Sequence, residues 1–209
     1  MFIGHYAVGF ALKKESEEVP LWLLFVCVQL FDIIVFSLAI LGVERIAYNP
    51  SDNPFFRTMI EYAPYSHSLI ANMVLAMLIF LLFKKIRGRK WGIIIGAAVI
   101  SHWFLDVIVH KADMPLFHDS FMAGFGLWHY PWVSFFFELT LLGLAGYYLL
   151  KNYHRIRRYL VLLALLAAGF CAMFFAPEAE ATPFQASVMS LSLYALFSVL
   201  AYWSERGGK

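Results

Sequence analysis

Six apolar segments, each long enough to cross a lipid bilayer, determine what this chain can fold into. They are residues 21–41, 66–83, 91–109, 132–150, 159–176 and 184–203. A helix rises about 1.5 Å per residue, so about 20 apolar residues cross the hydrocarbon core of a membrane. Because lipid offers the backbone no hydrogen-bond partners, such segments must be helical. The sequence therefore predicts an all-α, polytopic membrane helix bundle with about six transmembrane helices, in a single integral membrane domain of residues 1–209.

The composition agrees with a membrane protein. Of the 209 residues, 62% are hydrophobic and 14% are charged, which is far from the usual composition of a soluble domain. The formal net charge of +2 is small, so it gives no reason to expect nucleic acid as the main substrate. Cys27 and Cys171 both lie in apolar segments without a CxxC spacing, which favours small core residues over a disulfide framework or a zinc knuckle.

The first twelve residues form a separate, shorter apolar run. They are too short to span and are followed by the charged stretch KKESEEVP. We expect a short N-terminal re-entrant or interfacial helix here. The turn-rich connection at residues 42–64 is expected to hold a short helix at about residues 55–62.

Basic residues concentrate in two loops, at residues 84–90 and 151–158. Positively charged loops favour the cytoplasmic side of a membrane. We therefore expect both termini in the cytoplasm.

The third apolar segment and the residue that follows it carry three ionisable residues at spacings of four, His102, Asp106 and His110. On a helix these positions share one face, and two imidazoles with a carboxylate have a metal-ligand spacing. Ionisable groups within a membrane cost several kcal/mol, about 2.5–3.5 each on insertion scales, unless they are paired, bound to metal or facing water. The simpler alternative is a buried polar network that ties helices together.

Further ionisable residues fall at a similar estimated depth in the other segments. Helical rise puts them in the outer half of the membrane. Zinc accepts imidazole nitrogen and carboxylate oxygen, and a carboxylate can bridge two ions. We expect a site with two or three Zn²⁺ ions, or other divalent metals, whose candidate ligands are His5, Asp32, His67, His102, Asp106, His110, His129 and Glu138.

The pieces GHYAVG, YSHSL and SHWFLD, in this order, resemble the YdjM-like family of metal-dependent hydrolases of the bacterial inner membrane. The resemblance covers residues 1–138, the expected metal-site part. The last two spans, within residues 159–203, carry none of these motifs.

The order of the motifs is also similar to that of zinc-dependent phospholipase C and the P1-type nucleases, helical enzymes that cleave phosphodiesters with three zinc ions. The resemblance implies that His67, His102 and Asp106 hold one ion and that Asp106 bridges to a second ion on His5. Asp32 would be the catalytic residue, as a base beside the attacking water or as a bridging ligand.

The resemblance further implies that His110 and His129 serve a third ion, but the sequence departs from the soluble enzymes there. Those enzymes complete this ion with a His-x3-Glu pair, whereas Val133 stands at that spacing after His129 and the nearest carboxylate is Glu138. They also use a processed amino terminus as a ligand, a role that would fall to Met1.

These observations together predict a membrane-embedded metal-dependent hydrolase that cleaves a phosphoester with a zinc-activated water. The expected substrate is a lipid or a lipid-linked phosphoester, reached from the outer leaflet of the bacterial inner membrane. The alternative is a divalent-metal transporter or a metal-binding membrane protein without hydrolase activity. A haem protein with His67 and His102 as axial ligands would leave the other ionisable residues without a role.

Overall fold

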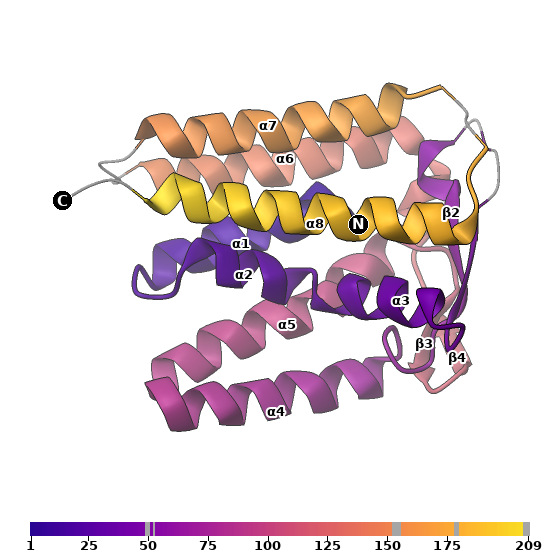
Figure 1. The fold of residues 1–209 in the computed structure, drawn as a ribbon, viewed down its shortest axis with the longest axis horizontal. Helices are drawn as coiled ribbons and strands as arrows, with labels where there is room; N and C mark the ends of the chain where they lie inside the picture. Colours follow the sequence, from indigo (N-terminus) through magenta and orange to yellow (C-terminus); the bar gives the residue numbers. More distant parts are fainter. Residues whose placement is uncertain (49–50, 52, 152–155, 178–179, 207–209) are drawn as a thin grey trace.

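The computed structural model describes residues 1–48, 51, 53–151, 156–177 and 180–206, and within them it confirms the all-α helix bundle. Most helices run along one direction (Figure 1). The basic loop predicted at residues 151–158 lies partly outside the described residues. The helices are α1 (Ile3–Glu15), α2 (Leu21–Val28), α3 (Leu30–Ile40), α4 (Leu69–Arg87), α5 (Arg89–Val109), α6 (Pro131–Leu150), α7 (Ile156–Phe175) and α8 (Pro183–Glu205), with 3-10 turns η1 (Pro54–Phe56) and η2 (Leu127–His129). The strands are β1 (Arg45–Tyr48), β2 (Thr58–Tyr62), β3 (Met114–Phe117) and β4 (Ser120–Ala123).

The bundle has the helices of a multi-pass membrane protein. In the described part of the chain, α4, α5, α6, α7 and α8 are each long and apolar enough to cross a membrane. The predicted span at residues 21–41 is broken at Gln29 into α2 and α3, which are bent by 56° from one another. Counted as one span, this pair gives the sixth crossing.

The N-terminal helix α1 lies inside the bundle. It packs against α6, α2 and α5, and Ile3, His5, Tyr6 and Phe10 have no exposed surface. The N-terminus lies near the middle of the bundle's length, and α1 runs from there toward one end (Figure 1). This short apolar helix is therefore part of the core, with its first turn at the centre of the molecule.

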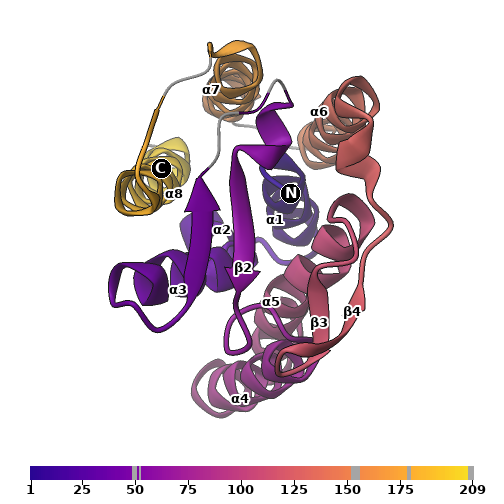
Figure 2. The ribbon, with the colours of Figure 1, turned by 90° about the vertical axis from the view of Figure 1, so that its right-hand side faces the viewer.

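One end of the bundle carries two antiparallel β-hairpins (Figure 2). Strands β1 and β2 form the first, and β3 and β4 form the second. The prediction of a helix at about residues 55–62 is wrong beyond Phe56. Asn53 caps a single 3-10 turn there, and Thr58–Tyr62 then pairs with β1, because this β-branched and aromatic segment has a partner strand beside it.

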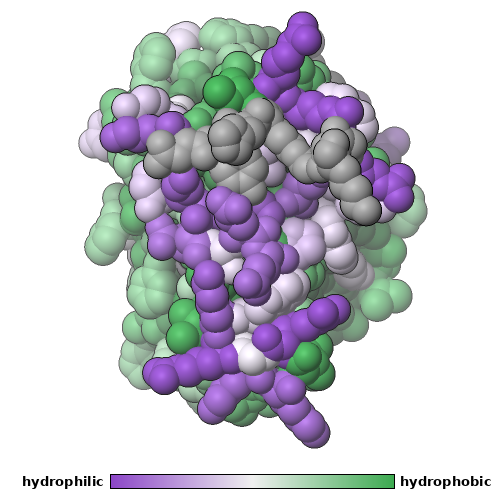
Figure 3. Space-filling view, turned by 90° about the vertical axis from the view of Figure 1, so that its left-hand side faces the viewer, coloured by the Kyte–Doolittle hydropathy of each residue, from purple (hydrophilic) through white to green (hydrophobic). Residues whose placement is uncertain are grey.

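The opposite end carries the turn between α4 and α5. Gly88 makes this turn at φ +96°, a conformation that side chains disfavour. One helical turn later, a Cβ atom on Gly92 would lie 2.7 Å from the carbonyl oxygen of Phe80, so glycine permits the close packing of α4 on α5. Hydrophilic side chains spread over this end and apolar side chains surround it (Figure 3).

Candidate metal centre

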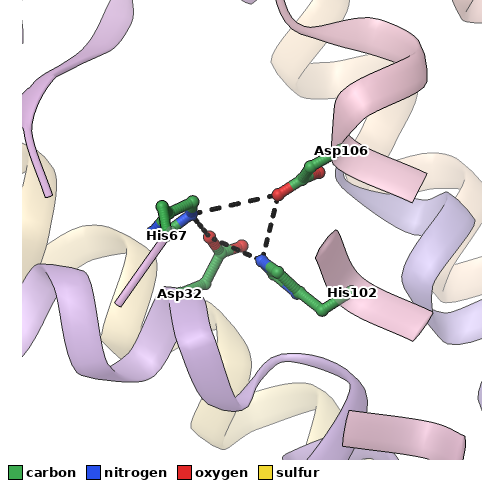
Figure 4. Close-up of side chains that lie close together, drawn as sticks. All are labelled: Asp32, His67, His102 and Asp106. Carbon is green, nitrogen blue, oxygen red and sulfur yellow. Dashed lines mark ion pairs between the residues drawn. The ribbon is translucent and has the colours of Figure 1, made fainter. Parts of the chain in front are cut away.

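Four side chains from three parts of the chain converge in the interior of the bundle. Asp32 comes from the first turn of α3, His67 from the segment before α4, and His102 and Asp106 from α5. One ligand atom from each lies within 4.8 Å of all the others. Figure 4 shows the four side chains pointing toward a common centre.

The distances within this cluster suit a small cation. His102 Nε2 lies 3.0 Å from Asp106 Oδ2 and 3.5 Å from Asp32 Oδ1. His67 Nε2 lies 3.5 Å from Asp32 Oδ1 and 3.9 Å from Asp106 Oδ2. Four donors placed tetrahedrally at about 2.0–2.1 Å from a zinc ion are separated from one another by about 3.3 Å. The four measured histidine–carboxylate separations, 3.0–3.9 Å, bracket that value.

The orientation of His102 is set by the break between α2 and α3. His102 Nδ1 donates to the carbonyl oxygen of Val28, the last residue of α2, at 2.8 Å. A carbonyl can only accept, so in the neutral ring the hydrogen sits on Nδ1 and Nε2 keeps its lone pair. That lone pair faces the two carboxylates.

The cluster is nearly sealed from solvent. His67, His102 and Asp106 are at most 1% exposed, and only the side chain of Asp32, at 15%, reaches the surface. Within the described residues, the Nε2 atoms of His67 and His102 are buried without a well-formed hydrogen bond. Buried polar atoms normally have partners, and two imidazole nitrogens with two carboxylates are a donor set that zinc and related divalent cations accept. The four residues could therefore hold a metal ion.

Two further groups gather on the other oxygen of Asp106. His5 Nε2 lies 3.1 Å from Asp106 Oδ1, and the amine of Met1 contacts the same atom. The ring of His5 stacks on that of His102, with ring centroids 4.1 Å apart. Asp106 thus joins the four-residue cluster through Oδ2 and the start of α1 through Oδ1.

His110 and His129 lie apart from the cluster. The helix α5 ends at Val109, and His110 adopts an extended conformation. Its backbone amide still donates to the carbonyl oxygen of Asp106 at 2.8 Å, but its Nδ1 pairs with Asp113 at 3.0 Å and its ring packs against Trp128. His129 is exposed and packs its ring against Phe56. Their role at a third ion stays a prediction.

Glu138 is fully buried on α6 but is bound to the backbone of α1. Its Oε2 accepts hydrogen bonds from the amides of Phe2 at 2.9 Å and Gly4 at 3.1 Å. It is not a member of the four-residue cluster. In this structure Glu138 anchors the helix that carries His5.

Three residues that support the cluster were not anticipated from sequence. Tyr194 of α8 donates its hydroxyl to Asp32 Oδ2 at 3.0 Å. Ser66 lies 2.8 Å from His67 Nδ1 and 2.6 Å from Glu44 Oε2. The adjacency of Ser66 to His67 was a usable signal, but nothing in the local sequence marks Glu44 or Tyr194.

No protein-family model matches the chain, and neither does a curated protein or a solved structure.

Proposed function

We propose that this protein is a membrane-embedded, zinc-dependent hydrolase that cleaves a phosphoester of a lipid or lipid-linked substrate. The observation that carries the proposal is the buried cluster of Asp32, His67, His102 and Asp106, in which two imidazole Nε2 atoms face two carboxylates. The order of these residues along the chain, which resembles that of zinc-dependent phosphodiesterases, supports the choice of reaction.

The residues take distinct roles in this proposal. His67, His102 and Asp106 would hold one ion, and His5 with Asp106 would hold a second. A divalent cation bound there would supply a Lewis acid that neutralises phosphoryl charge and lowers the pKa of a coordinated water. Asp32 is the most exposed of the four cluster residues, so it is the one placed to meet substrate and to accept a proton.

A substrate from the bilayer suits the position of the cluster. The donors lie within a bundle of apolar helices, and the neighbouring helices α4 and α6 expose large apolar side chains on their outer faces. A phosphoester attached to a lipid would stay in the surrounding membrane while its headgroup reaches Asp32.

The proposal also includes the orientation of the bundle in the membrane. The basic residues Lys84, Lys85, Arg87, Arg89 and Lys90 lie at the end with the α4–α5 turn, so that end faces the cytoplasm by the positive-inside rule. The β-hairpins then face the outer side of the bacterial inner membrane. Single cysteines at Lys85 and at Asp119, in a chain lacking Cys27 and Cys171, test this with a membrane-impermeant thiol reagent on intact cells. Labelling at residue 119 alone is expected, and labelling at residue 85 alone would contradict the orientation.

Metal content and hydrolysis measured on the same purified samples test the function. Wild-type protein is expected to retain stoichiometric zinc and to cleave at least one member of a panel of phospholipid and lipid-linked phosphoesters. His102→Ala and Asp106→Ala should lose both properties, whereas Asp119→Ala, which removes an exposed carboxylate at the tip of the β3–β4 hairpin, should keep both.

The transporter alternative is separated by an uptake assay. Zinc uptake into proteoliposomes, together with no cleavage of any phosphoester in the panel, would overturn the hydrolase and favour a divalent-metal transporter.

A further inference from the structure

A chain of hydrogen bonds links His67 to a buried carboxylate outside the cluster. Glu44, immediately before β1, is 1% exposed, and Ser66 has no exposed surface. The Ser66 hydroxyl oxygen lies 2.6 Å from Glu44 Oε2 and 2.8 Å from His67 Nδ1. The three groups therefore form one continuous relay that ends on the ring of a cluster histidine.

The direction of these hydrogen bonds follows from what each group can donate. A carboxylate only accepts, and Glu44 Oε1 already accepts from the amides of Tyr65 and Ser66 at 2.9 Å each. The Ser66 hydroxyl must therefore donate to Glu44 Oε2, which leaves its oxygen as an acceptor. His67 Nδ1 is then the donor to Ser66, and His67 Nε2 keeps the lone pair that faces Asp32 and Asp106.

The backbone around His67 is held independently of this relay. Asn72 Nδ2 donates to the carbonyl oxygens of Ser66 at 2.7 Å and Ser68 at 3.0 Å. Trp103 Nε1 donates to the carbonyl oxygen of His67 at 3.0 Å. The Ser66 hydroxyl is therefore not needed to hold this backbone, and its contact with His67 Nδ1 acts on the imidazole ring alone.

We propose that Glu44 and Ser66 are positioning residues that hold His67 in its Nδ1–H tautomer and so present the Nε2 lone pair to a metal ion. The inference rests on the metal centre of the proposed function. In this proposal the Glu44 carboxylate orients His67 through Ser66, as the Val28 carbonyl orients His102 directly. Such outer partners fix the tautomer and ring orientation of metal-binding histidines.

The substitution Glu44→Gln is expected to reverse the direction of both hydrogen bonds, and it keeps the size and shape of the side chain at residue 44. The amides of Tyr65 and Ser66 require an oxygen at the position of Oε1, so the glutamine NH2 group faces Ser66 Oγ and donates to it. The Ser66 hydroxyl, no longer bound to a carboxylate, can then donate to His67 Nδ1, and we expect the ring hydrogen on Nε2. Zinc affinity is expected to fall about 10–100-fold.

The test is nitrogen NMR on protein with ¹⁵N-labelled histidine in lipid nanodiscs, without metal, followed by a zinc titration against a chelator. Wild-type His67 is expected in the Nδ1–H form and Glu44→Gln in the Nε2–H form. Ser66→Thr retains a hydroxyl and should keep the wild-type spectrum, whereas Ser66→Ala should lose the fixed tautomer. Glu61→Gln, at an exposed glutamate on β2, is the matched control.

The metal-free spectra decide this inference separately from the function. An unchanged His67 tautomer in both Glu44→Gln and Ser66→Ala would overturn it. Wild-type protein that binds no zinc or cleaves no phosphoester would contradict the proposed function, while the spectra would still show whether Glu44 and Ser66 set the tautomer. Circular dichroism of each variant confirms that the helices are retained.

Discussion

At the scale of single residues, the cluster depends on partners that hold each ligand in one orientation. Tyr194 is such a partner, because it donates to Asp32 Oδ2 and leaves Oδ1 to face both histidines. We expect Tyr194→Phe to weaken zinc binding about 10-fold and to lower the free energy of unfolding by about 1.5–3 kcal/mol.

Competition with a chelator measures the first effect and denaturant unfolding in detergent the second. The control is Tyr147→Phe, which removes the hydroxyl of a side chain that is 66% exposed. Equal zinc affinity in Tyr194→Phe and wild type would show that Asp32 does not need this hydrogen bond.

The four residues of the cluster are all among the metal ligands predicted from sequence, but the residues that support them are not. His102 and Asp106 follow from helical periodicity, since residues four apart share a face. The same periodicity does not make His110 a member of the cluster, because its ring pairs with Asp113 and packs on Trp128. Glu44 and Tyr194 reach the site through contacts across 22 and 162 positions of sequence, which no local pattern in a single chain encodes.

At the scale of elements, α1 is held at both ends by buried polar contacts. At its start, Glu138 accepts from two backbone amides that the first turn of a helix leaves unpaired. Glu138→Ala would bury both amides without an acceptor, at a cost of about 1–3 kcal/mol each. Glu138→Gln keeps an acceptor oxygen and should lose much less. Denaturant unfolding of both variants checks this, and equal losses would show that the hydrogen bonds contribute little.

At its other end, α1 is tied to α8 by a largely buried ion pair. Lys13 Nζ lies 2.6 Å from Glu205 Oε1, and the two side chains are 4% and 18% exposed. Breaking such a pair leaves a buried charge, so Lys13→Met is expected to lower the free energy of unfolding by about 3–5 kcal/mol.

A double-mutant cycle with Glu205→Gln isolates the interaction between the two side chains. Lys14→Met, at the next position, is the control and should change stability far less. Strictly additive effects of the two substitutions would mean that Lys13 and Glu205 do not stabilise one another.

Long helices were the most predictable elements of the fold, and elements that depend on tertiary contacts were the least predictable. The boundaries of α5 and α6 follow closely from the apolar runs, because lipid imposes length and helicity on them. The break at Gln29 was missed, since an apolar run of this length satisfies the same criteria whether it is straight or bent. Strand β2 was missed because its pairing partner, β1, lies across a loop.

At the scale of the whole molecule, the four-residue cluster links three separate parts of the chain, so a bound metal ion should stabilise the entire bundle. A ligand that binds only the folded state adds about 2.7 kcal/mol at a concentration of 100 times its Kd. Thermal unfolding in detergent should therefore shift upward with zinc and return with a chelator. His102→Ala should show no shift and Asp119→Ala a full one. A shift of equal size in His102→Ala would place the zinc elsewhere.

The hydrogen bond from Tyr194 to Asp32 also has a consequence for when the proposed centre can be completed during synthesis. Tyr194 lies in the last helix, so a nascent chain acquires both histidines and both carboxylates well before the residue that orients Asp32 leaves the ribosome. Asp32 gains this partner only when α8 has been made and has docked, so we expect the proposed centre to bind metal tightly only after that step.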